Sequence, residues 1–212
     1  TLPVSISSQE TSGKTDTGIL LAKELGISFL DTGLMYRAIT YYFIKSQIDE
    51  NNIQCINKGI FENINIQVPD SQNVILNNID ISKKIFSDEV NNKVSIYAGI
   101  QIVRENLVIK QQLIAENSDI VMVGRDIGTV VLPEAEFKFF LDCSLNTRAT
   151  RRMHQSDKKK FINEKDKINY RDFLDKNREI SPLVPSDDAV MVFNDHINLE
   201  ETVKLIKDII LN

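Results

Sequence analysis

The fold is set close to the N-terminus by Leu2-Pro3-Val4-Ser5-Ile6-Ser7 and, after a polar turn, by Ser12-Gly13-Lys14-Thr15. Apolar and small residues alternate in the first segment, which is typical of a short strand. Beyond the turn, apolar residues from Ile19 to Leu25 recur at helical spacing and stop at Gly26, a residue common after a helix C-terminus. Strand, turn and helix in this order place backbone N–H groups at a helix N-terminus, where they bind anions. The sequence therefore predicts a phosphate-binding turn.

The alternation of strands and helices continues along the chain. Ile27–Leu30 is a second short apolar run, and a helical pattern follows from Leu34 to about Ile48. This order of elements predicts a parallel α/β sheet. Later strands are expected at Asp119–Val123, Phe137–Leu141 and Ala189–Phe193, and later helices at Asp88–Ala98, Ile100–Glu116, Asn146–Ser156, Ile168–Arg178 and Leu199–Leu211.

A different pattern interrupts this alternation between about Asn57 and Ser82. Apolar residues alternate at Ile64–Val68, and two further short extended runs follow at Val74–Leu76 and Ile79–Ile81, with polar turns between them. Closely spaced strands of this kind predict a small antiparallel meander inserted in the α/β body.

The composition is that of a globular protein. The 212 residues are 42% hydrophobic and 26% charged, which suits one core with a small insert. No apolar run approaches the roughly 18–20 residues that span a bilayer, so we expect no membrane association. Cys55 and Cys143 form no C-x-x-C pair, which argues against a disulfide scaffold or zinc ribbon and favours a cytoplasmic location. His154 and His196 are too few for a multi-histidine metal centre.

Basic residues are concentrated in one segment, from Arg148 to Arg178. It holds 11 basic and 5 acidic residues, whereas the rest of the chain holds 14 basic and 25 acidic ones. Five of the eight arginines lie in this segment. An acidic body argues against binding a nucleic-acid polymer, and one basic segment favours closure over a small polyanion. Arginine suits that task because its planar fork binds phosphate bidentately.

The turn itself matches only part of the phosphate-loop pattern G-x-x-x-x-G-K-[ST]. Lys14 would reach the β- and γ-phosphate oxygens, and the Thr15 hydroxyl would bind Mg²⁺. The first glycine of the pattern is replaced by Ser8. Glu10 and Asp16 place carboxylates beside the expected triphosphate, which should weaken its binding. Taken alone, the motif is a weak signal.

Four segments together make the chain resemble the bacterial cytidylate kinases, which are P-loop kinases of the nucleoside monophosphate kinase superfamily. They are Ser12-Gly13-Lys14-Thr15, Asp31-Thr32-Gly33-Leu34-Met35-Tyr36-Arg37, Gly124-Arg125-Asp126-Ile127-Gly128-Thr129-Val130-Val131, and Arg171 through Pro182-Leu183. The resemblance covers essentially the whole chain. It departs from the family pattern at Ser7, Ser8, Thr11, Asp16, Phe86 and Leu174.

The resemblance implies a fold and a division of the chain. The fold is a three-layer α/β P-loop NTPase fold with a five-stranded parallel core sheet, a small antiparallel insert and a lid. The whole of residues 1–212 would form one domain. Its core would comprise residues 1–56, 97–150 and 179–212, the nucleoside-monophosphate-binding insert about 57–96, and the lid about 151–178.

The resemblance also implies the site residues, with ATP and Mg²⁺ on one side and CMP or dCMP on the other. Residues expected to bind ATP are Ser8, Gln9, Glu10, Thr11, Ser12, Gly13, Lys14, Thr15 and Asp16, with Thr15 as the metal ligand. Residues expected to bind CMP are Thr32, Arg37, Ser95, Arg104, Asp126, Arg171, Asp175 and Arg178. Those expected at the transferring phosphoryl group are Lys14, Arg151, Arg152 and Arg178.

The chemistry of two of these residues suits cytosine. A carboxylate such as Asp126 accepts a hydrogen bond from the cytosine amino group, and a guanidinium such as Arg104 donates to the ring acceptors. Uracil presents an oxygen in place of the amino group, which leaves a carboxylate facing an acceptor. We expect Arg37, Arg171 and also Arg178 at the α-phosphate, Asp175 at the ribose, and Arg148 in a structural role.

The expected function is therefore phosphoryl transfer from ATP to CMP or dCMP by a cytoplasmic monomer. Two alternatives remain open from the sequence. One is a non-catalytic or weakly active nucleotide-binding protein, favoured by the altered phosphate loop. The other is a kinase for UMP or AMP.

Overall fold

The computed structural model describes residues 1–49, 56–155 and 161–212. Cys55 and the lysine run at 158–160 lie outside the described residues. A five-stranded sheet in the order β2-β6-β1-β7-β8 forms the centre of the molecule, and every pairing in it is parallel. Its strands are β1 (Pro3–Ser8), β2 (Ser28–Asp31), β6 (Ile120–Gly124), β7 (Phe137–Asp142) and β8 (Val190–Phe193).

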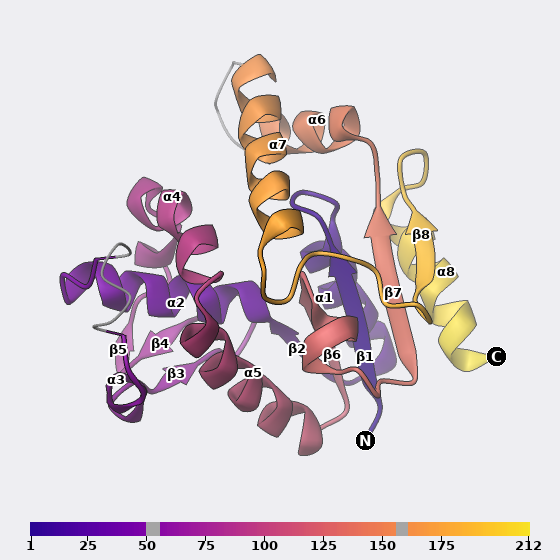
Figure 1. Cartoon of the computed structure of the whole chain (residues 1–212). Coiled ribbons are helices and arrows are strands. Elements are labelled where there is room, and N and C mark those ends of the chain that lie inside the picture. The colour runs from indigo at the N-terminus through magenta and orange to yellow at the C-terminus, as the bar shows by residue number, and fades with distance from the viewer. Residues whose placement is uncertain (50–55, 156–160) are drawn as a thin grey trace.

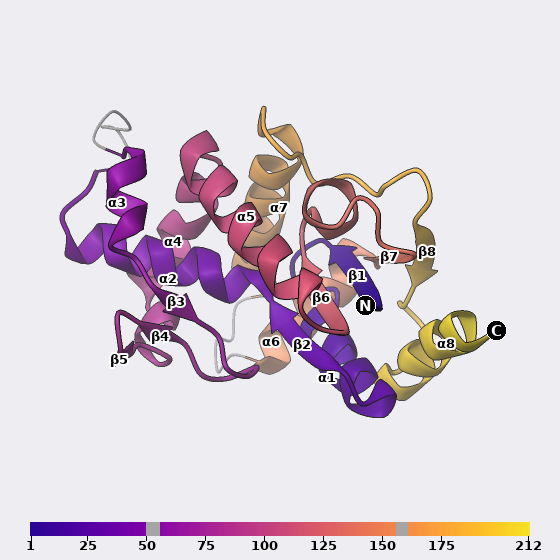
Figure 2. The same cartoon turned by 90° about the horizontal axis from the view of Figure 1, so that it is seen from below.

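Helices cover both faces of this sheet. Successive residues of a strand point to opposite faces, so apolar residues of the strands pack against helices on each side. Ile120 and Met122 of β6 join an apolar cluster with α2 and α5, whereas Val121 and Val123 join one with α1 and α8. Figure 2 shows α1 and α8 on one side of the sheet and α5 on the other. The helices are α1 (Lys14–Leu25), α2 (Thr32–Lys45), α3 (Lys58–Glu62), α4 (Asp88–Tyr97), α5 (Gln101–Glu116), α6 (Leu145–Gln155), α7 (Phe161–Asn177) and α8 (Leu199–Leu211).

The expected antiparallel insert is present beyond α2, on the β2 side of the sheet (Figure 1). Its three strands pair in the order β3-β4-β5. They are β3 (Ile66–Gln67), β4 (Ile75–Leu76) and β5 (Ile79–Asp80), shorter than the sequence predicts. Asn77 and Asn78 form the turn between β4 and β5 with positive φ of 49° and 64°. Asparagine tolerates this region better than most residues.

Four further elements differ from the sequence-based expectation. Helix α7 begins at Phe161, seven residues before the predicted Ile168. Helix α1 begins at Lys14, before its apolar pattern becomes visible, because Gly13 adopts a left-handed φ of 91° that starts it. The short helix α3 precedes β3. Ile127–Val131 forms one turn of π-helix directly after β6, in which the Leu132 N–H donates to the Ile127 carbonyl. Such turns are often found at functional sites.

The carboxyl ends of β1, β2, β6, β7 and β8 meet at one edge of the sheet, and α6 and α7 stand above that edge (Figure 1). Ligands of open α/β sheets bind at this edge. None of the helices in the described part of the chain is long and apolar enough to cross a membrane.

Candidate active site

The turn between β1 and α1 is built around buried serines. Ser8 ends β1 without a positive φ, so a serine stands at the pattern's first glycine position without left-handed strain. Its Oγ accepts a hydrogen bond of 2.5 Å from the Ser12 Oγ. The Ser12 carbonyl accepts a bond of 2.9 Å from the Asn194 Nδ2. These contacts, together with Gly13, hold the residues that lead into α1.

Thr11 is the strained residue of this turn. Its φ is 62°, in the left-handed region where a β-branched side chain is a rare outlier. Its buried hydroxyl also has no hydrogen-bond partner in the described structure. Thr11, which departs from the family pattern, therefore has a conformational cost of about 1–2 kcal/mol, whereas Ser8, at the first glycine position of the pattern, has none.

Lys14 and Thr15 begin α1 and face the sheet edge. Burial, and after it the charge of Arg125, lowers the pKa of Lys14 to about 7. Its Nζ donates to the Gln9 carbonyl at 3.4 Å. The Thr15 Oγ1 donates to the Asp31 carboxylate at 2.8 Å. A cation, a hydroxyl and a carboxylate thus lie together beside the turn.

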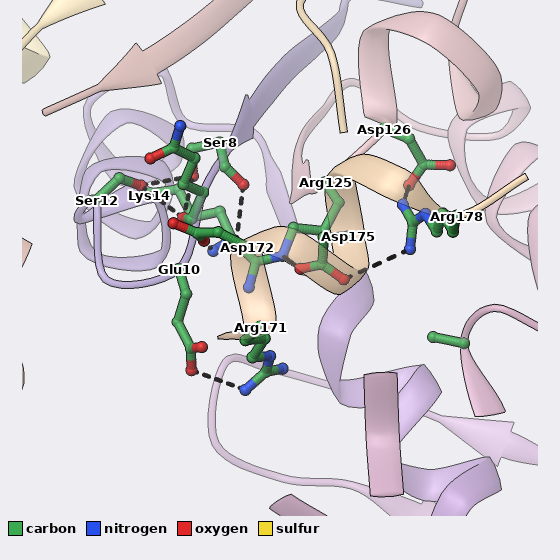
Figure 3. A network of polar contacts seen from close by, with 12 residues as sticks. Ser8, Glu10, Ser12, Lys14, Arg125, Asp126, Arg171, Asp172, Asp175 and Arg178 are labelled. Atoms are coloured by element: carbon green, nitrogen blue, oxygen red, sulfur yellow. Dashed lines mark hydrogen bonds and ion pairs between the residues drawn. The ribbon is translucent and has the colours of Figure 1, made fainter. Parts of the chain in front are cut away.

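A pocket of about 330 Å³ opens next to these groups, between the turn and helices α2, α4 and α7. At one end Arg104 donates from Nη1 to the Ala98 carbonyl at 3.1 Å and from Nη2 to Asp126. The two side chains are only 3% and 5% exposed. Arg178 lies 3.8 Å from the second Asp126 oxygen (Figure 3). The ring of Tyr36 lies 5.3 Å from the Arg104 Cζ, and burial raises the pKa of Tyr36 to about 12.

Asp175 of α7 connects this end of the pocket to the turn. Arg125 pairs with it through Nε at 2.9 Å and donates from Nη1 to the Ser8 carbonyl at 2.9 Å. Arg178 Nη1 lies 3.8 Å from Asp175 (Figure 3). Arg178 also donates from Nε to the Ser181 carbonyl. Helix α7 is therefore connected through Arg125, the residue that follows β6, to the turn.

Arg37 of α2 faces the same pocket. Its Nη1 donates to the Ile85 carbonyl at 3.1 Å and to the Asn91 side chain at 2.6 Å. The Phe86 ring lies 5.0 Å from its Cζ, within cation–π distance. Burial, and after it the charge of Arg171, lowers the pKa of Arg37 to about 10.

Glu10 of the turn contacts α6 and α7. Its Oε1 accepts from Arg171 Nη1 at 2.7 Å (Figure 3) and from Arg152 Nη1 at 3.3 Å. Burial alone would raise the pKa of Glu10, but the charges of Arg171, Arg125 and Arg152 hold it below its usual range. The carboxylate thus lies in a cluster of positive charge.

A second pocket of about 380 Å³ uses other residues of the same turn as its wall. Arg151 lines this second pocket and not the first. Its Nη1 donates to the Ser12 carbonyl at 2.9 Å, and its Nη2 donates to the Asn194 carbonyl at 2.7 Å. These bonds hold Arg151 in the second pocket, apart from Arg152 and Arg178, with which the family resemblance groups it.

The expected site residues therefore fall into three groups. The first pocket is lined by Glu10, Lys14, Thr15, Thr32, Arg37, Ser95, Arg104, Asp126, Arg152, Arg171, Asp175 and Arg178. The second is lined by Thr11, Gly13, Asp16 and Arg151. Ser8, Gln9 and Ser12 line neither pocket. Within the first pocket, Thr32 is 3% exposed and its hydroxyl donates to the Val123 carbonyl at 3.0 Å.

Sequence reasoning did not assign two residues of this region. Asp31 lines the first pocket and holds Thr15, and Asn194 lines the second and holds Ser12. Asp31 is the last residue of β2, and Asn194 directly follows β8. A polar residue at the carboxyl end of a parallel strand was the available signal.

Solved structures share this architecture at low sequence identity. An uncharacterized protein from Eubacterium ventriosum matches with a TM-score of 0.56 and 11% identity, over 99% of this chain and 97% of its own. Shikimate kinase from Bacteroides thetaiotaomicron matches with a TM-score of 0.52 and 10% identity, over 100% of this chain and 99% of its own. At these identities the likeness establishes the fold alone, the α/β fold of P-loop kinases.

Sequence comparison establishes the family. The cytidylate kinase family model matches residues 4–212. Cytidylate kinase from Streptococcus uberis is 40% identical over 212 residues, covering 97% of this chain and 94% of its own. Cytidylate kinase from Bacillus anthracis is 38% identical over 217 residues, covering 99% of this chain and 96% of its own. A match of this length and identity, on a chain with this fold, means that the protein belongs to the cytidylate kinase family.

Proposed function

We propose that the protein transfers the γ-phosphoryl group of ATP to CMP or dCMP, giving ADP and CDP or dCDP. One observation carries the proposal beyond family membership. The buried Arg104–Asp126 pair and the phosphate-loop Lys14 line the same pocket, which has a volume of about 330 Å³. Side chains suited to a polar base and a side chain suited to phosphate thus line one cavity.

The base would bind at the Arg104–Asp126 end. Asp126 would accept from the cytosine amino group, and Arg104 with the Ser95 hydroxyl would contact the ring acceptors. Uracil would place its oxygen against Asp126, and an unsatisfied buried polar group costs about 1–3 kcal/mol. Asp175 would contact the ribose, after giving up part of its pairing with Arg125.

The phosphates would bind among the cations between that end and the turn. Arg37 and Arg171 suit the α-phosphate of the acceptor, since each presents a planar guanidinium. Lys14, Arg152 and Arg178 suit the group in transfer. Phosphoryl transfer needs little covalent help from a protein, so alignment and neutralisation of charge by these side chains would supply most of the catalysis.

ATP would lie across the phosphate loop. Its nucleoside suits the second pocket, where Arg151 and Asn194 form part of the wall. Gly13 lines that pocket and Lys14 lines the first, so a chain of phosphates passing over these two residues leads from one to the other. In this arrangement Arg151 holds the donor and does not touch the transferring group.

Thr15 and Asp31 would hold the Mg²⁺ ion that accompanies ATP. Their hydroxyl and carboxylate oxygens are 2.8 Å apart at the edge of the first pocket, and oxygen ligands of this kind suit Mg²⁺. When bound, the ion supplies neutralisation of charge on the phosphates. Asp16 follows Thr15 in sequence but lines the other pocket, so it is not part of this ligand set.

A coupled assay of ADP formation with ATP, Mg²⁺ and CMP tests the proposal. We expect ADP to form at least about tenfold faster with CMP than without it, because bound CMP holds the attacking phosphate oxygen in line with the γ-phosphoryl group, whereas water is not held there. Equal rates with and without CMP would show that the protein is not a CMP kinase. Competition among CMP, dCMP, UMP and AMP in one reaction identifies the preferred acceptor, and preference for UMP or AMP would replace the base assignment.

The division of the chain belongs to the same proposal. Residues of about 57–96, which contain β3, β4, β5 and α4, would serve as the insert that binds the monophosphate. Residues of about 151–178, which contain the C-terminal part of α6 and all of α7, would serve as the lid over the core. We also propose a cytoplasmic monomer, which cell fractionation and light scattering after size-exclusion chromatography would test.

A further inference from the structure

The Glu10 carboxylate occupies a position that the proposed chemistry gives to phosphate. Glu10 belongs to the turn, yet its side chain reaches α6 and α7, where it pairs with Arg152 and Arg171. Figure 3 shows the side chain leaving the turn and pointing at Arg171. The side chain is 12% exposed, so the pair with Arg171 is largely shielded from water.

Four cations surround this carboxylate. Arg171, Arg125, Arg152 and Lys14 all act on Glu10 electrostatically, and all line the first pocket with it. Without Glu10, Arg125 would still pair with Asp175 and Arg152 with Glu164, but Arg171 and Lys14 would lose a neighbouring counter-charge, which is unfavourable at this spacing. Carboxylate and phosphate present the same chemistry to a guanidinium, because each offers paired anionic oxygens to its planar fork. A phosphate that enters the cluster must therefore either displace Glu10 or bind beside a like charge.

We propose that Glu10 is an internal counter-anion: in the nucleotide-free protein it holds Arg152 and Arg171 over the phosphate loop, and nucleotide phosphates displace it when they bind. The proposal rests on the proposed function only in taking this cluster as the phosphate site. Two consequences follow. The lid arginines are already aligned before the substrates arrive, and the affinity for phosphates is reduced by the cost of displacing Glu10.

The binding of inorganic tripolyphosphate, followed by calorimetry, tests the proposal without requiring catalysis. We expect Glu10→Gln to bind tripolyphosphate about tenfold more tightly than the unaltered protein, because the competing charge is gone. Glu24→Gln is the matched control: it removes one carboxylate whose partner is Lys207, far along the chain on α8. That control should leave the affinity within about twofold, since a distant exposed charge is screened by salt.

A second measurement uses the proteins without ligand. Glu10→Gln should melt at a lower temperature than the unaltered protein, because the cations lose their counter-charge, and tripolyphosphate should restore more of its stability than it adds to the unaltered protein. If Glu10→Gln does not fold, Glu10→Asp keeps the charge but shortens its reach, and should bind tripolyphosphate more tightly than the unaltered protein. Unchanged or weaker binding by the folded variant would overturn the proposal.

The outcome is separable from that of the proposed function. Tighter tripolyphosphate binding by Glu10→Gln, with no CMP-dependent ADP formation by either protein, would support the counter-anion and reject the kinase. CMP-dependent ADP formation, with the same tripolyphosphate affinity and the same KM for ATP in both proteins, would support the kinase and reject the counter-anion.

Discussion

At the scale of single residues, the buried pair of Arg104 and Asp126 is the feature with the largest consequences. Both side chains are at most 5% exposed, so neither charge is stabilised by bulk water. A buried pair of this kind contributes little net stability, but removal of one partner leaves the other uncompensated. Arg178 is the only other cation paired with Asp126 in the described structure. We therefore expect the pair to serve substrate binding and not stability.

Asp126→Asn should reduce discrimination between CMP and UMP. The amide can donate to the uracil oxygen that a carboxylate would repel, so the ratio of kcat/KM for CMP to that for UMP should fall by about tenfold or more. Steady-state kinetics with both acceptors measures the ratio. Asp188→Asn is a matched control, because it alters an aspartate paired with Lys138 at 61% exposure outside both pockets. An unchanged ratio in Asp126→Asn would refute the assignment of Asp126 to the base.

Lys14 should make phosphate binding depend on pH. Its pKa is about 7 without ligand, and bound phosphate favours the protonated amine. Below pH 7 the charge is already present and the affinity for ATP is at its full value. As the pH rises above 7, binding must recover a proton, so the affinity should fall by up to about tenfold per pH unit until the pKa of the bound lysine is reached.

Titration calorimetry with ATP between pH 7 and 9, in buffers of different ionisation enthalpy, measures both the affinity and the proton uptake. Lys14→Arg should have a flatter profile, because a guanidinium remains charged across this range. A profile for the unaltered protein as flat as that of Lys14→Arg would show that Lys14 binds no phosphate or does not titrate there.

At the scale of elements, local patterns predicted the order of strands and helices, and long-range contacts decided the rest. Helix α8 spans the predicted Leu199–Leu211, because Asn198 and Glu201 form a capping box that is local in sequence. The π-turn after β6 was not predicted, since its first N–H groups are held by the Ser7 hydroxyl from another strand. Such a contact leaves no periodic signal in the sequence.

The site shows the same limit. The family resemblance predicts the residues of the phosphate loop and assigns Arg104 and Asp126 to one base, but not how the arginines of α6 and α7 are distributed between the pockets. Arg151 and Arg152 are neighbours on α6, and successive residues of an α-helix point about 100° apart. They therefore line different pockets, which only the placement of α6 on the core determines.

Helices α6 and α7 are held together by a buried ion pair. Arg148 Nη1 lies 2.5 Å from Asp172 Oδ2, with side chains 5% and 7% exposed. Arg148→Met should lower the free energy of unfolding by about 3–5 kcal/mol, because it leaves the Asp172 charge buried and unpaired. Arg148→Met combined with Asp172→Leu should cost less than the single change. Urea denaturation measures both.

The exposed Glu24–Lys207 pair gives the comparison for this prediction, with side chains 39% and 32% exposed. Lys207→Met should cost less than about 1 kcal/mol, as exposed pairs generally do. Additive effects of the Arg148 and Asp172 substitutions would mean that the two charges do not interact across α6 and α7.

At the scale of the whole molecule, the first pocket lies where the central sheet, the insert and helix α7 meet. The apolar cluster with α1 and α8 supports one face of the sheet, and the larger cluster joins α2 and α5 to the insert. Between α4 and α7 lies a cleft of about 220 Å³ lined mainly by polar and charged residues. A polar cleft between two packed bodies can close at small cost when a polyanion neutralises its arginines.

Closure of this cleft should be visible by hydrogen exchange. With CMP and a non-hydrolysable ATP analogue bound together, amide exchange in α4 and α7 should slow by about tenfold or more, because phosphates shared by Arg37 on α2 and Arg171 on α7 draw the two bodies together. Exchange in α8, which packs on α1 behind the sheet, should not change. Mass spectrometry of peptides from the three helices measures the effect. CMP alone should protect α4 and α7 less than both nucleotides together, since Arg171 and Asp175 of α7 would contact CMP but Arg152 of α6 would need the donor phosphates. Slowing confined to the phosphate loop would mean that the nucleotides bind to a rigid, already closed protein.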